Sequence, residues 1–233
     1  MTLLPGAARA FDLLTTGRFG ELGEKLAHRM RASAYEIDES YGLRRDLRAA
    51  FTAPAAKIPI TIREASARDA AVLFGDEAAE LDPAASGDIA WRHEIFAAGL
   101  PTCFVAVDTR TDTPCYVQWL MGASQNAQIK SIGCFPTLGP DEALLENAFT
   151  PSRYRGMGIM PAAMALIAER ASDLGANTVI TFVHRDNVAS LKGCERAGFS
   201  PYVMRRRARY CFNLIERVGF NPLPAAAPLL AAE

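Results

Sequence analysis

The sequence predicts a mixed α/β fold, a sheet flanked by helices, behind a helical N-terminal extension. From residue 57 onward, short apolar segments with a period of two alternate with longer segments of helical period. The first 56 residues lack this alternation, and the residues after 216 are rich in Pro and Ala. We therefore predict three parts: a helical extension at 1–56, one α/β domain at 57–216 and a disordered tail at 217–233.

Apolar residues in the extension recur every four positions, at Leu22, Leu26 and Met30. This spacing predicts an amphipathic helix over about 18–35, whose apolar face needs a partner surface. In one interpretation the helix packs on the main domain or on the second subunit of a homodimer. In the other it forms a lid over the substrate site or lies on a membrane surface. Acidic residues at Glu21 and Glu24 argue against the membrane version.

The first elements of the domain follow from local patterns. Residues 58–62 alternate isoleucine with other residues, which predicts a strand with its apolar face at even positions. Ser66 is a suitable helix N-cap, and Asp69 three residues later completes a capping-box pattern. A second helix is expected at 88–98, where Gly99 ends it.

The rest of the domain continues the alternation of strands and helices. Further strands are expected at 102–108, 115–122, 143–150 and 177–183, with a last extended region at 200–216. Helices are expected at 155–174 and 188–197, the second ending at Gly198. The stretch 123–141 carries several glycines and prolines and is predicted to be irregular.

Composition excludes several classes of protein. The chain has 233 residues, 50% hydrophobic and 22% charged, which is typical of a soluble globular protein. Its formal net charge of −1 argues against a global affinity for nucleic acid. Five widely spaced cysteines without a C-x-x-C pair indicate reduced thiols, a cytoplasmic location and no metal site. No apolar run reaches the roughly 18 residues of a membrane span.

The most informative segment joins an expected strand to an expected helix, and reads Phe149-Thr150-Pro151-Ser152-Arg153-Tyr154-Arg155-Gly156-Met157-Gly158-Ile159. Gly156 and Gly158 let the backbone approach a ligand closely. The free amides of the first helical turn and the helix dipole favour an anion, and Arg153 and Arg155 add positive charge. The segment therefore fits a pyrophosphate, with a plain tight turn as the alternative. It lacks the Gly-Lys-Ser/Thr of a P-loop and the third glycine of the dinucleotide fingerprint.

A second motif follows about thirty residues later. The expected strand at 177–183 leads into Asn187, and the next helix ends at Gly198-Phe199. With the earlier Arg153-x-x-Gly156-x-Gly158, this order resembles the GNAT superfamily of N-acetyltransferases, whose motif A has the form [QR]-x-x-G-x-[GA]. The resemblance covers about 58–212.

The resemblance implies acetyl-CoA, or another acyl-CoA, as the donor and a mostly antiparallel, twisted GNAT-type sheet. In this family the strands expected here at 143–150 and 177–183 separate, and the pantetheine arm lies between them. Amides from about Tyr154 to Ile159 would hold the pyrophosphate, and Asn187 would bond to the arm or orient the loop. The implied CoA-binding residues are Phe149, Thr150, Arg153, Tyr154, Arg155, Gly156, Met157, Gly158, Ile159, Asn187 and Ser190.

Family chemistry is direct attack of an amine on the thioester, which requires a base for the ammonium proton and an acid for the CoA thiolate. The family's usual acid is a Tyr seven residues after the motif Asn, but here that position is Cys194. A cysteine, with an unperturbed pKa of about 8.5, could return the proton; the alternative is a small apolar filler. Tyr202 and Tyr154 are the substitutes.

Glu146 and His184 are the main candidates for the base, and Glu142 and His93 are weaker ones. Glu146 lies in the strand beside the implied thioester, and His184 ends the next strand, where it could take a proton near neutral pH. The alternatives are a salt-bridged Glu and an ordinary surface His. His93 and Trp91 belong to the second helix, which borders the acceptor pocket in this family.

We therefore expect a cytoplasmic GNAT-type N-acetyltransferase that moves an acetyl group from acetyl-CoA to an amine of a small molecule. Three alternatives stay open: transfer of a longer acyl group, transfer to a protein or peptide amine, and a CoA-binding module without catalysis. We expect no nucleic-acid partner, no membrane span and no metal.

Overall fold

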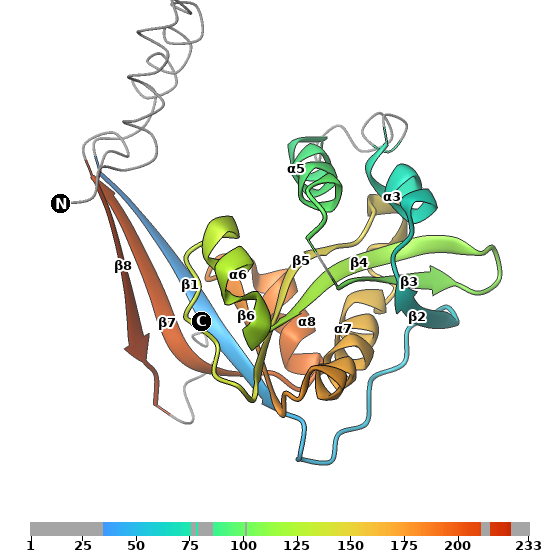
Figure 1. The fold of residues 1–233 in the computed structure, drawn as a ribbon. Helices are drawn as coiled ribbons and strands as arrows, with labels where there is room; N and C mark the ends of the chain where they lie inside the picture. Colours follow the sequence, from blue (N-terminus) through green and yellow to red (C-terminus); the bar gives the residue numbers. More distant parts are fainter. Residues whose placement is uncertain (1–34, 76–77, 79–85, 101, 211–214, 225–233) are drawn as a thin grey trace, which may run out of the picture. The chain divides into compact units, whose positions relative to one another are not determined.

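The computed structural model describes residues 35–75, 78, 86–100, 102–210 and 215–224, and within them an eight-stranded sheet flanked by helices (Figure 1). This confirms the predicted fold class. The strands are β1 (Tyr35–Asp46), β2 (Ile60–Glu64), β3 (Cys103–Asp108), β4 (Thr113–Gly122), β5 (Glu142–Phe149), β6 (Thr178–His184), β7 (Ser200–Tyr210) and β8 (Ile215–Pro222). The helices are α3 (Ala67–Phe74), α5 (Ser86–Ala97), α6 (Asn126–Ile132), α7 (Ile159–Glu169) and α8 (Val188–Arg196), with 3-10 turns η2 (Ala123–Gln125), η3 (Ser152–Tyr154) and η4 (Arg170–Leu174).

The strand order in the sheet is β2-β3-β4-β5-β6-β1-β7-β8. Strands β2 to β5 pair antiparallel, each with the next. β5 and β6 pair in parallel over three residue pairs, from Glu142↔Thr178 to Leu144↔Ile180. The site described below lies where this short parallel pairing stops.

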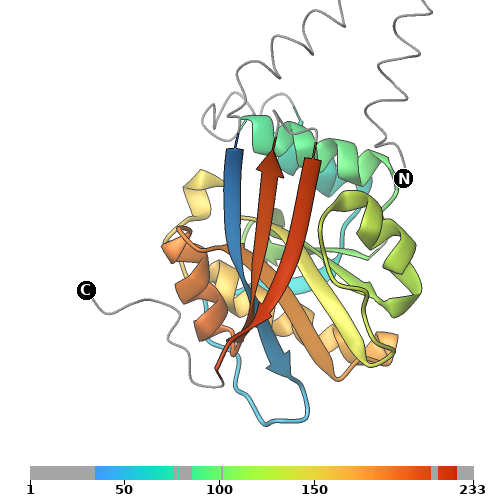
Figure 2. The same cartoon turned by 90° about the vertical axis from the view of Figure 1, so that its left-hand side faces the viewer.

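The described residues divide into two compact units, and strands β1 and β7 pass through both. The larger unit holds residues 41–203 with 223–224, and the smaller holds 35–40, 204–210 and 215–222. In the smaller unit, ion pairs join neighbouring strands: Arg209 to Glu36 at 3.3 Å and Arg207 to Glu216 at 2.7 Å. Figure 2 shows β1 beside β7, and β7 beside β8.

Two apolar cores of the larger unit cover the two faces of its sheet. α7 and α8 lie on one face, and α3 and α5 lie on the other (Figure 1). α7 is apolar on nearly all sides, and eight of its eleven residues are buried. Helix α3 begins at Ser66, which forms the predicted capping box with Asp69.

The prediction that residues 1–56 are a helical extension is wrong for residues 35–46, which form β1 between β6 and β7. The second half of the strand is packed into the sheet, where Leu43 is fully buried and buried and exposed side chains alternate from Leu43 to Asp46. Gly42 lies so close to its neighbours that a Cβ there would come within 2.8 Å of Phe182 on β6 and 2.4 Å of Val203 on β7. Most of the predicted helix over 18–35 lies outside the described residues.

Three other boundaries differ from the prediction. The stretch 123–141 is not wholly irregular, because η2 and α6 form there and Ile129 anchors the helix in the core. The helix expected from 155 begins at Ile159, since both glycines before it adopt left-handed φ values. Residues 217–222 of the predicted disordered tail belong to β8.

Candidate acyl-CoA site

β5 turns away from β6 at a bulge. Between the pairs Val117↔Phe149 and Trp119↔Glu146, β5 has one residue more than β4. Asn147 takes up this extra length with a φ of 58°, a left-handed conformation that asparagine tolerates better than most residues. The bulge bends β5, so the two parallel strands separate beyond Leu144 and Ile180.

A cavity of about 200 Å³ fills the space where the two strands separate. All of its walls belong to the larger unit. Its lining comes from α5, β4, β5, β6, α7 and α8, together with Asn187, which caps α8. The residues that line it are Arg92, Gln118, Glu146, Asn147, Ala148, Met160, Met164, Thr181, Phe182, Val183, His184, Asn187, Ser190 and Cys194.

The cavity brings together three of the four predicted catalytic residues, namely Glu146, His184 and Cys194. It does not include Tyr202, which packs with the core on the α3 and α5 face, under the guanidinium of Arg44 at 5.6 Å. Burial raises the pKa of Tyr202 to about 12. Its place in the fold gives Tyr202 no route to the cavity, and we do not propose it as a catalytic group.

Glu146 is held across the gap between the strands. Its Oε1 accepts a 2.8 Å hydrogen bond from the backbone amide of Phe182 on β6. A carboxylate at this position lies in the cavity and is able to accept a proton from a substrate amine.

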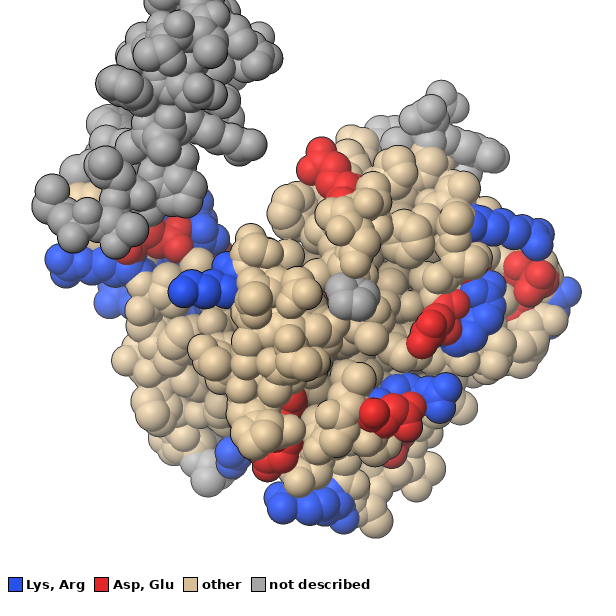
Figure 3. All heavy atoms as spheres, viewed as in Figure 1, with Lys and Arg blue, Asp and Glu red and all other residues tan. Residues whose placement is uncertain are grey.

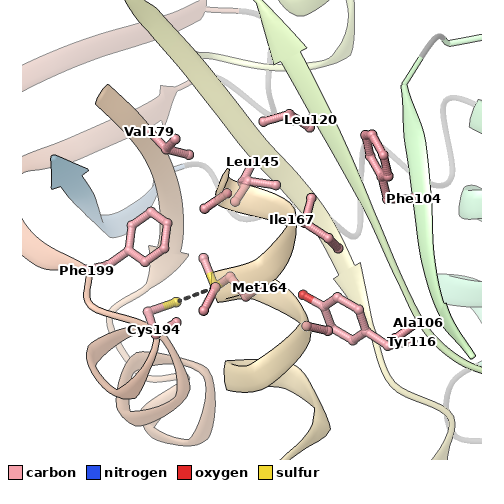
Figure 4. Close-up of a cluster of buried hydrophobic side chains, with 14 of the residues drawn as sticks. Phe104, Ala106, Tyr116, Leu120, Leu145, Met164, Ile167, Val179, Cys194 and Phe199 are labelled. Atoms are coloured by element: carbon pink, nitrogen blue, oxygen red, sulfur yellow. Dashed lines mark hydrogen bonds between the residues drawn. The ribbon is translucent and has the colours of Figure 1, made fainter. Parts of the chain in front are cut away.

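Cys194 is a fully buried thiol in the α7 and α8 core (Figure 4). Its Sγ lies 3.8 Å from Sδ of Met164, and burial raises its pKa to about 12. A thiol whose pKa is raised in this way is a poor proton donor to a CoA thiolate, because burial stabilises its protonated form. This geometry favours the space-filling interpretation of Cys194.

His184 and the start of α8 form the rim of the cavity. Nδ1 of His184 accepts a hydrogen bond from the amide of Asp186 at 3.2 Å, and the side chain is 45% exposed. Oδ1 of Asn187 accepts the amide of Ser190 at 3.1 Å, the usual N-cap bond. The carbonyl oxygen of Asn187 accepts the first intrahelical bond, so this residue shapes the rim and holds the helix end.

Arg92 is a cavity residue that the sequence analysis did not identify, although it named the neighbours Trp91 and His93. Those two side chains are exposed, whereas Arg92 turns inward and is 12% exposed. Its Nε and Nη2 donate to the carbonyl oxygens of Asn147 and Ala148 at 3.3 and 3.1 Å, so it holds the bulge. The only signal in the sequence was that Arg92 lies three residues from both Ile89 and Ile95, which are buried, and so shares their helix face. This signal was weak.

The position of Arg92 has an electrostatic consequence. Burial lowers its pKa, and the carboxylate of Asp88, 3.8 Å away, is largely exposed. The guanidinium also lies 5.1 Å from the ring of Phe149, a cation–π distance. The cavity wall on the α5 side therefore carries a weakly neutralised positive charge.

The loop before α7 has the geometry of an anion site. Gly156 and Gly158 have φ values of 76° and 70°, so the backbone turns twice into the left-handed region. The predicted range of amides began at Tyr154, but the amides of Tyr154 and Arg155 donate to the carbonyl oxygens of Pro151 and Ser152 at 2.8 and 3.1 Å. Among the described residues, none accepts a hydrogen bond from the amides of residues 156–160. Successive unpartnered amides in such a turn, at a helix N-terminus, form a concave site for phosphate oxygens.

Neighbouring contacts hold this loop in place. The carbonyl oxygen of Met157 accepts the amide of Lys57 at 2.8 Å, and Nε of Arg155 donates to the carbonyl oxygen of Thr150 at 3.1 Å. The guanidinium of Arg153 lies 5.2 Å from the ring of Tyr154. Phe149 is expected to bind the donor through its backbone, and this role stays a prediction; its ring is buried in the opposite core near Phe74.

Two properties of the described residues bear on the kind of site. No group of three or more His, Cys, Asp or Glu side chains is arranged to hold a metal ion there. Within the same residues, no helix has both the length and the apolar character that a membrane crossing requires.

Acidic and basic side chains lie close together at several places on the face in Figure 3.

Comparison with known proteins is consistent with this geometry. A family model described as an acetyltransferase (GNAT) domain matches residues 60–200, more than half of the chain. The chain belongs to the GNAT acetyltransferase family. Acyl transfer from acyl-CoA is the chemistry that this GNAT fold implies. A search of curated proteins found no match to the sequence.

Solved structures show the same GNAT fold at low identity. A GNAT-family acetyltransferase from Colwellia psychrerythraea is 17% identical, with a TM-score of 0.50 over 76% of this chain and 56% of that one. A GCN5-related N-acetyltransferase from Sphaerobacter thermophilus is 15% identical, with a TM-score of 0.51 over 81% and 56%. The glucosamine N-acetyltransferase region of a fungal multi-domain β-N-acetylglucosaminidase is 14% identical, with a TM-score of 0.52 over 82% and 22%. This chain thus spans little more than half the length of the first two proteins.

Proposed function

We propose that this protein transfers an acetyl group from acetyl-CoA to an amine of a small-molecule acceptor. One observation carries the proposal: the cavity between β5 and β6 lies beside α7, whose first turn and preceding loop present unpartnered amides. A donor with an anionic pyrophosphate and an extended amide-bearing arm matches both features. The family implies that such a donor is an acyl-CoA.

The donor side of the site is assigned to the α7 and α8 face. The amides of residues 156–160 hold the pyrophosphate, with Arg153 and Arg155 at the rim. The arm enters between β5 and β6, where Thr181 and Asn187 line the cavity. Met160 and Met164 supply an apolar wall for the methylene groups of the arm.

The acceptor reaches the thioester from the α5 side, where Arg92 and the bulge of β5 lie. The amine nitrogen forms a bond to the acyl carbon, and the carbonyl electron pair moves to the oxygen. The C–S bond then breaks and CoA leaves as a thiolate. Glu146 takes the ammonium proton, and the thiolate takes a proton from solvent.

We take acetyl as the acyl group because the matching family model describes an acetyltransferase domain. A small molecule is our proposed acceptor. Transfer of a longer acyl group and transfer to a peptide amine are the alternatives. The four described cysteines are not in disulfide bonds, which supports the proposal of a cytoplasmic location.

Isothermal titration with acetyl-CoA, followed by measurement of CoA-thiol release in a panel of amines, tests the proposal. The panel includes aliphatic amines, amino acids, glucosamine and a short peptide. We expect micromolar binding and release of thiol with at least one small amine. Absence of acetyl-CoA binding would refute the donor site. Binding without release by any amine would favour the second candidate, a CoA-binding module, which the absence of a Tyr at position 194 keeps open.

A further inference from the structure

Gln118 on β4 is almost completely buried, with 1% of its surface exposed, and yet it lines the cavity. The β4–β5 register places it between Val117, which pairs with Phe149, and Trp119, which pairs with Glu146. Gln118 therefore lies opposite the bulge of β5. Glu146 and Arg92 line the same cavity.

The phenol of Tyr116 fixes the orientation of this amide. Tyr116 donates a 2.6 Å hydrogen bond from its hydroxyl to Oε1 of Gln118. Tyr116 is fully buried, and burial raises its pKa well above the ordinary value, so the hydroxyl stays protonated and remains a donor. Because Oε1 accepts this bond, Nε2 at the other end of the amide is available to donate a hydrogen bond into the cavity.

Nε2 of Gln118 has no acceptor among the described residues. Nε2 is not among the buried side-chain atoms that lack a partner, so it keeps access to the cavity, where a ligand atom or a water can accept its hydrogen bond. The group is a donor only, so the ligand atom must be an acceptor. The acceptors that the donor substrate offers are the amide carbonyls of its arm and the thioester carbonyl oxygen. The thioester is the group that reacts beside Glu146, and Gln118 is next to Trp119, the register partner of Glu146, so the thioester carbonyl oxygen is the matching atom.

We infer that Gln118 is a further catalytic residue, whose Nε2 donates to the carbonyl oxygen of the acyl thioester, and that Tyr116 is its positioning residue. The inference rests on the proposed acyl-CoA function. As the amine attacks, the carbonyl electron pair moves to this oxygen, and the hydrogen bond strengthens with the developing negative charge. When the C–S bond breaks, the carbonyl of the new amide re-forms and the bond weakens again.

A comparison of two ligands on two variants measures this hydrogen bond in the absence of an acceptor substrate. Acetyl-CoA is compared with S-ethyl-CoA, a thioether that has a methylene in place of the carbonyl, on wild type and on Gln118→Met. Methionine keeps the volume and removes the donor. We expect wild type to bind acetyl-CoA about fivefold more tightly than S-ethyl-CoA, and Gln118→Met to bind the two equally.

Gln125→Met is the matched control, because Gln125 is also a buried glutamine with a bonded Oε1, which accepts the amide of Gly122. It should keep the wild-type preference. Tyr116→Phe keeps the ring and removes the hydroxyl, so it should lower the preference partly. With an accepted amine, Gln118→Met should lower kcat about 10²-fold with little change in the KM for acetyl-CoA.

The possible outcomes distinguish a failure of the proposed function from a failure of the inference about Gln118. If wild type binds neither thioester nor thioether, the proposed function fails and the inference fails with it. If wild type binds both and Gln118→Met leaves their ratio unchanged, the inference alone is wrong. If Gln118→Met does not fold, Tyr116→Phe decides: an unchanged ratio in that folded variant contradicts the positioning role and the inference.

Discussion

The backbone amide of Phe182 donates a 2.8 Å hydrogen bond to the side chain of Glu146, across the gap between β6 and β5. The register that ends at Leu144↔Ile180, continued by two residues, would place these two residues opposite each other. A carboxylate thus replaces the backbone acceptor that β6 loses when the strands separate. Glu146 both keeps the gap ordered and places a base in it.

These two roles of Glu146 are separable by mutation. Glu146→Gln keeps an oxygen that accepts from Phe182 but removes the base, so we expect acetyl-CoA affinity to stay within a few-fold while kcat falls about 10²-fold. Steady-state kinetics and titration calorimetry measure the two effects. Glu146→Ala also removes the acceptor and should in addition lower the melting temperature. Full activity in Glu146→Gln would exclude this residue as the base.

Gly158→Val should weaken acetyl-CoA binding at least tenfold. There is space for a Cβ at Gly158, since its closest contact would be 3.7 Å, but a φ of 70° is strained for a β-branched residue. The loop will relax and turn its amides away. Gly175→Val is the control, because Gly175 has a φ of 77° and open space around its Cβ, but lies after η4.

Both glycine variants should lose a similar amount of stability, about 1–2 kcal/mol. Only the variant at Gly158 should change the dissociation constant measured by titration calorimetry. Equal affinities in two folded variants would show that the pyrophosphate does not bind at this loop.

Cys194 should behave as a space-filling residue. Because it is fully buried and burial raises its pKa to about 12, we expect Cys194→Ala and Cys194→Ser to retain turnover within a few-fold of wild type. Each should lower the free energy of unfolding by about 1–2 kcal/mol, from a small cavity or a buried hydroxyl. Cys115→Ala, at another fully buried thiol, controls for the stability loss. If turnover by the folded serine variant instead drops by about two orders of magnitude, the thiol has a role in proton transfer.

Strand β1 should be indispensable, although the sequence analysis placed it in a separable extension. Gly42→Val puts a side chain where even a Cβ would come within 2.4 Å of Val203, so we expect a loss of about 3 kcal/mol in urea unfolding. Gly219→Val, at a glycine of β8 with open space around its Cβ, should be nearly neutral. Deletion of residues 1–56 should give no folded protein. A soluble, CoA-binding deletion variant would contradict the central position of β1.

Asp69 should make stability depend on pH in the acidic range. Burial raises its pKa, but bonds from Arg63 and Ser66 outweigh burial and lower it to about 2, below the unfolded value of about 3.9. Its contribution is therefore complete above pH 4 and is lost as the pH falls through 2.

Urea unfolding at a series of pH values checks the role of Asp69. Asp69→Asn should cost about 2 kcal/mol at pH 7, and its difference from wild type should shrink between pH 4 and pH 2. Asp173→Asn, which removes one partner of an exposed pair with Arg170 at 3.7 Å, should change little at any pH. A constant difference between wild type and Asp69→Asn from pH 7 to pH 2 would contradict the linkage.

Local sequence patterns were sufficient to identify features whose geometry depends only on residues close in the chain. The capping box at Ser66 and Asp69, the left-handed turns at Gly156 and Gly158, and the N-cap at Asn187 depend on neighbours within four residues. Of these, the sequence analysis named the capping box and the residues Gly156, Gly158 and Asn187, and the family resemblance rested on the last three together with Arg153 and Gly198-Phe199. Glu146 and Cys194 were named from that resemblance and His184 from its place at a strand end, and their catalytic roles stay predictions.

What the sequence by itself determined was the alternation of elements, the GNAT motifs and the chemistry of the loop before α7, because each depends on contacts local in the chain. Tertiary structure alone decided that β1 lies between β6 and β7, that Arg92 rather than Trp91 or His93 turns inward, and that Tyr116 holds Gln118 at the cavity. The partners in these relationships are distant in sequence or depend on which face of an element is buried. Their energies come from packing across the sheet, and no local pattern of residues records that packing.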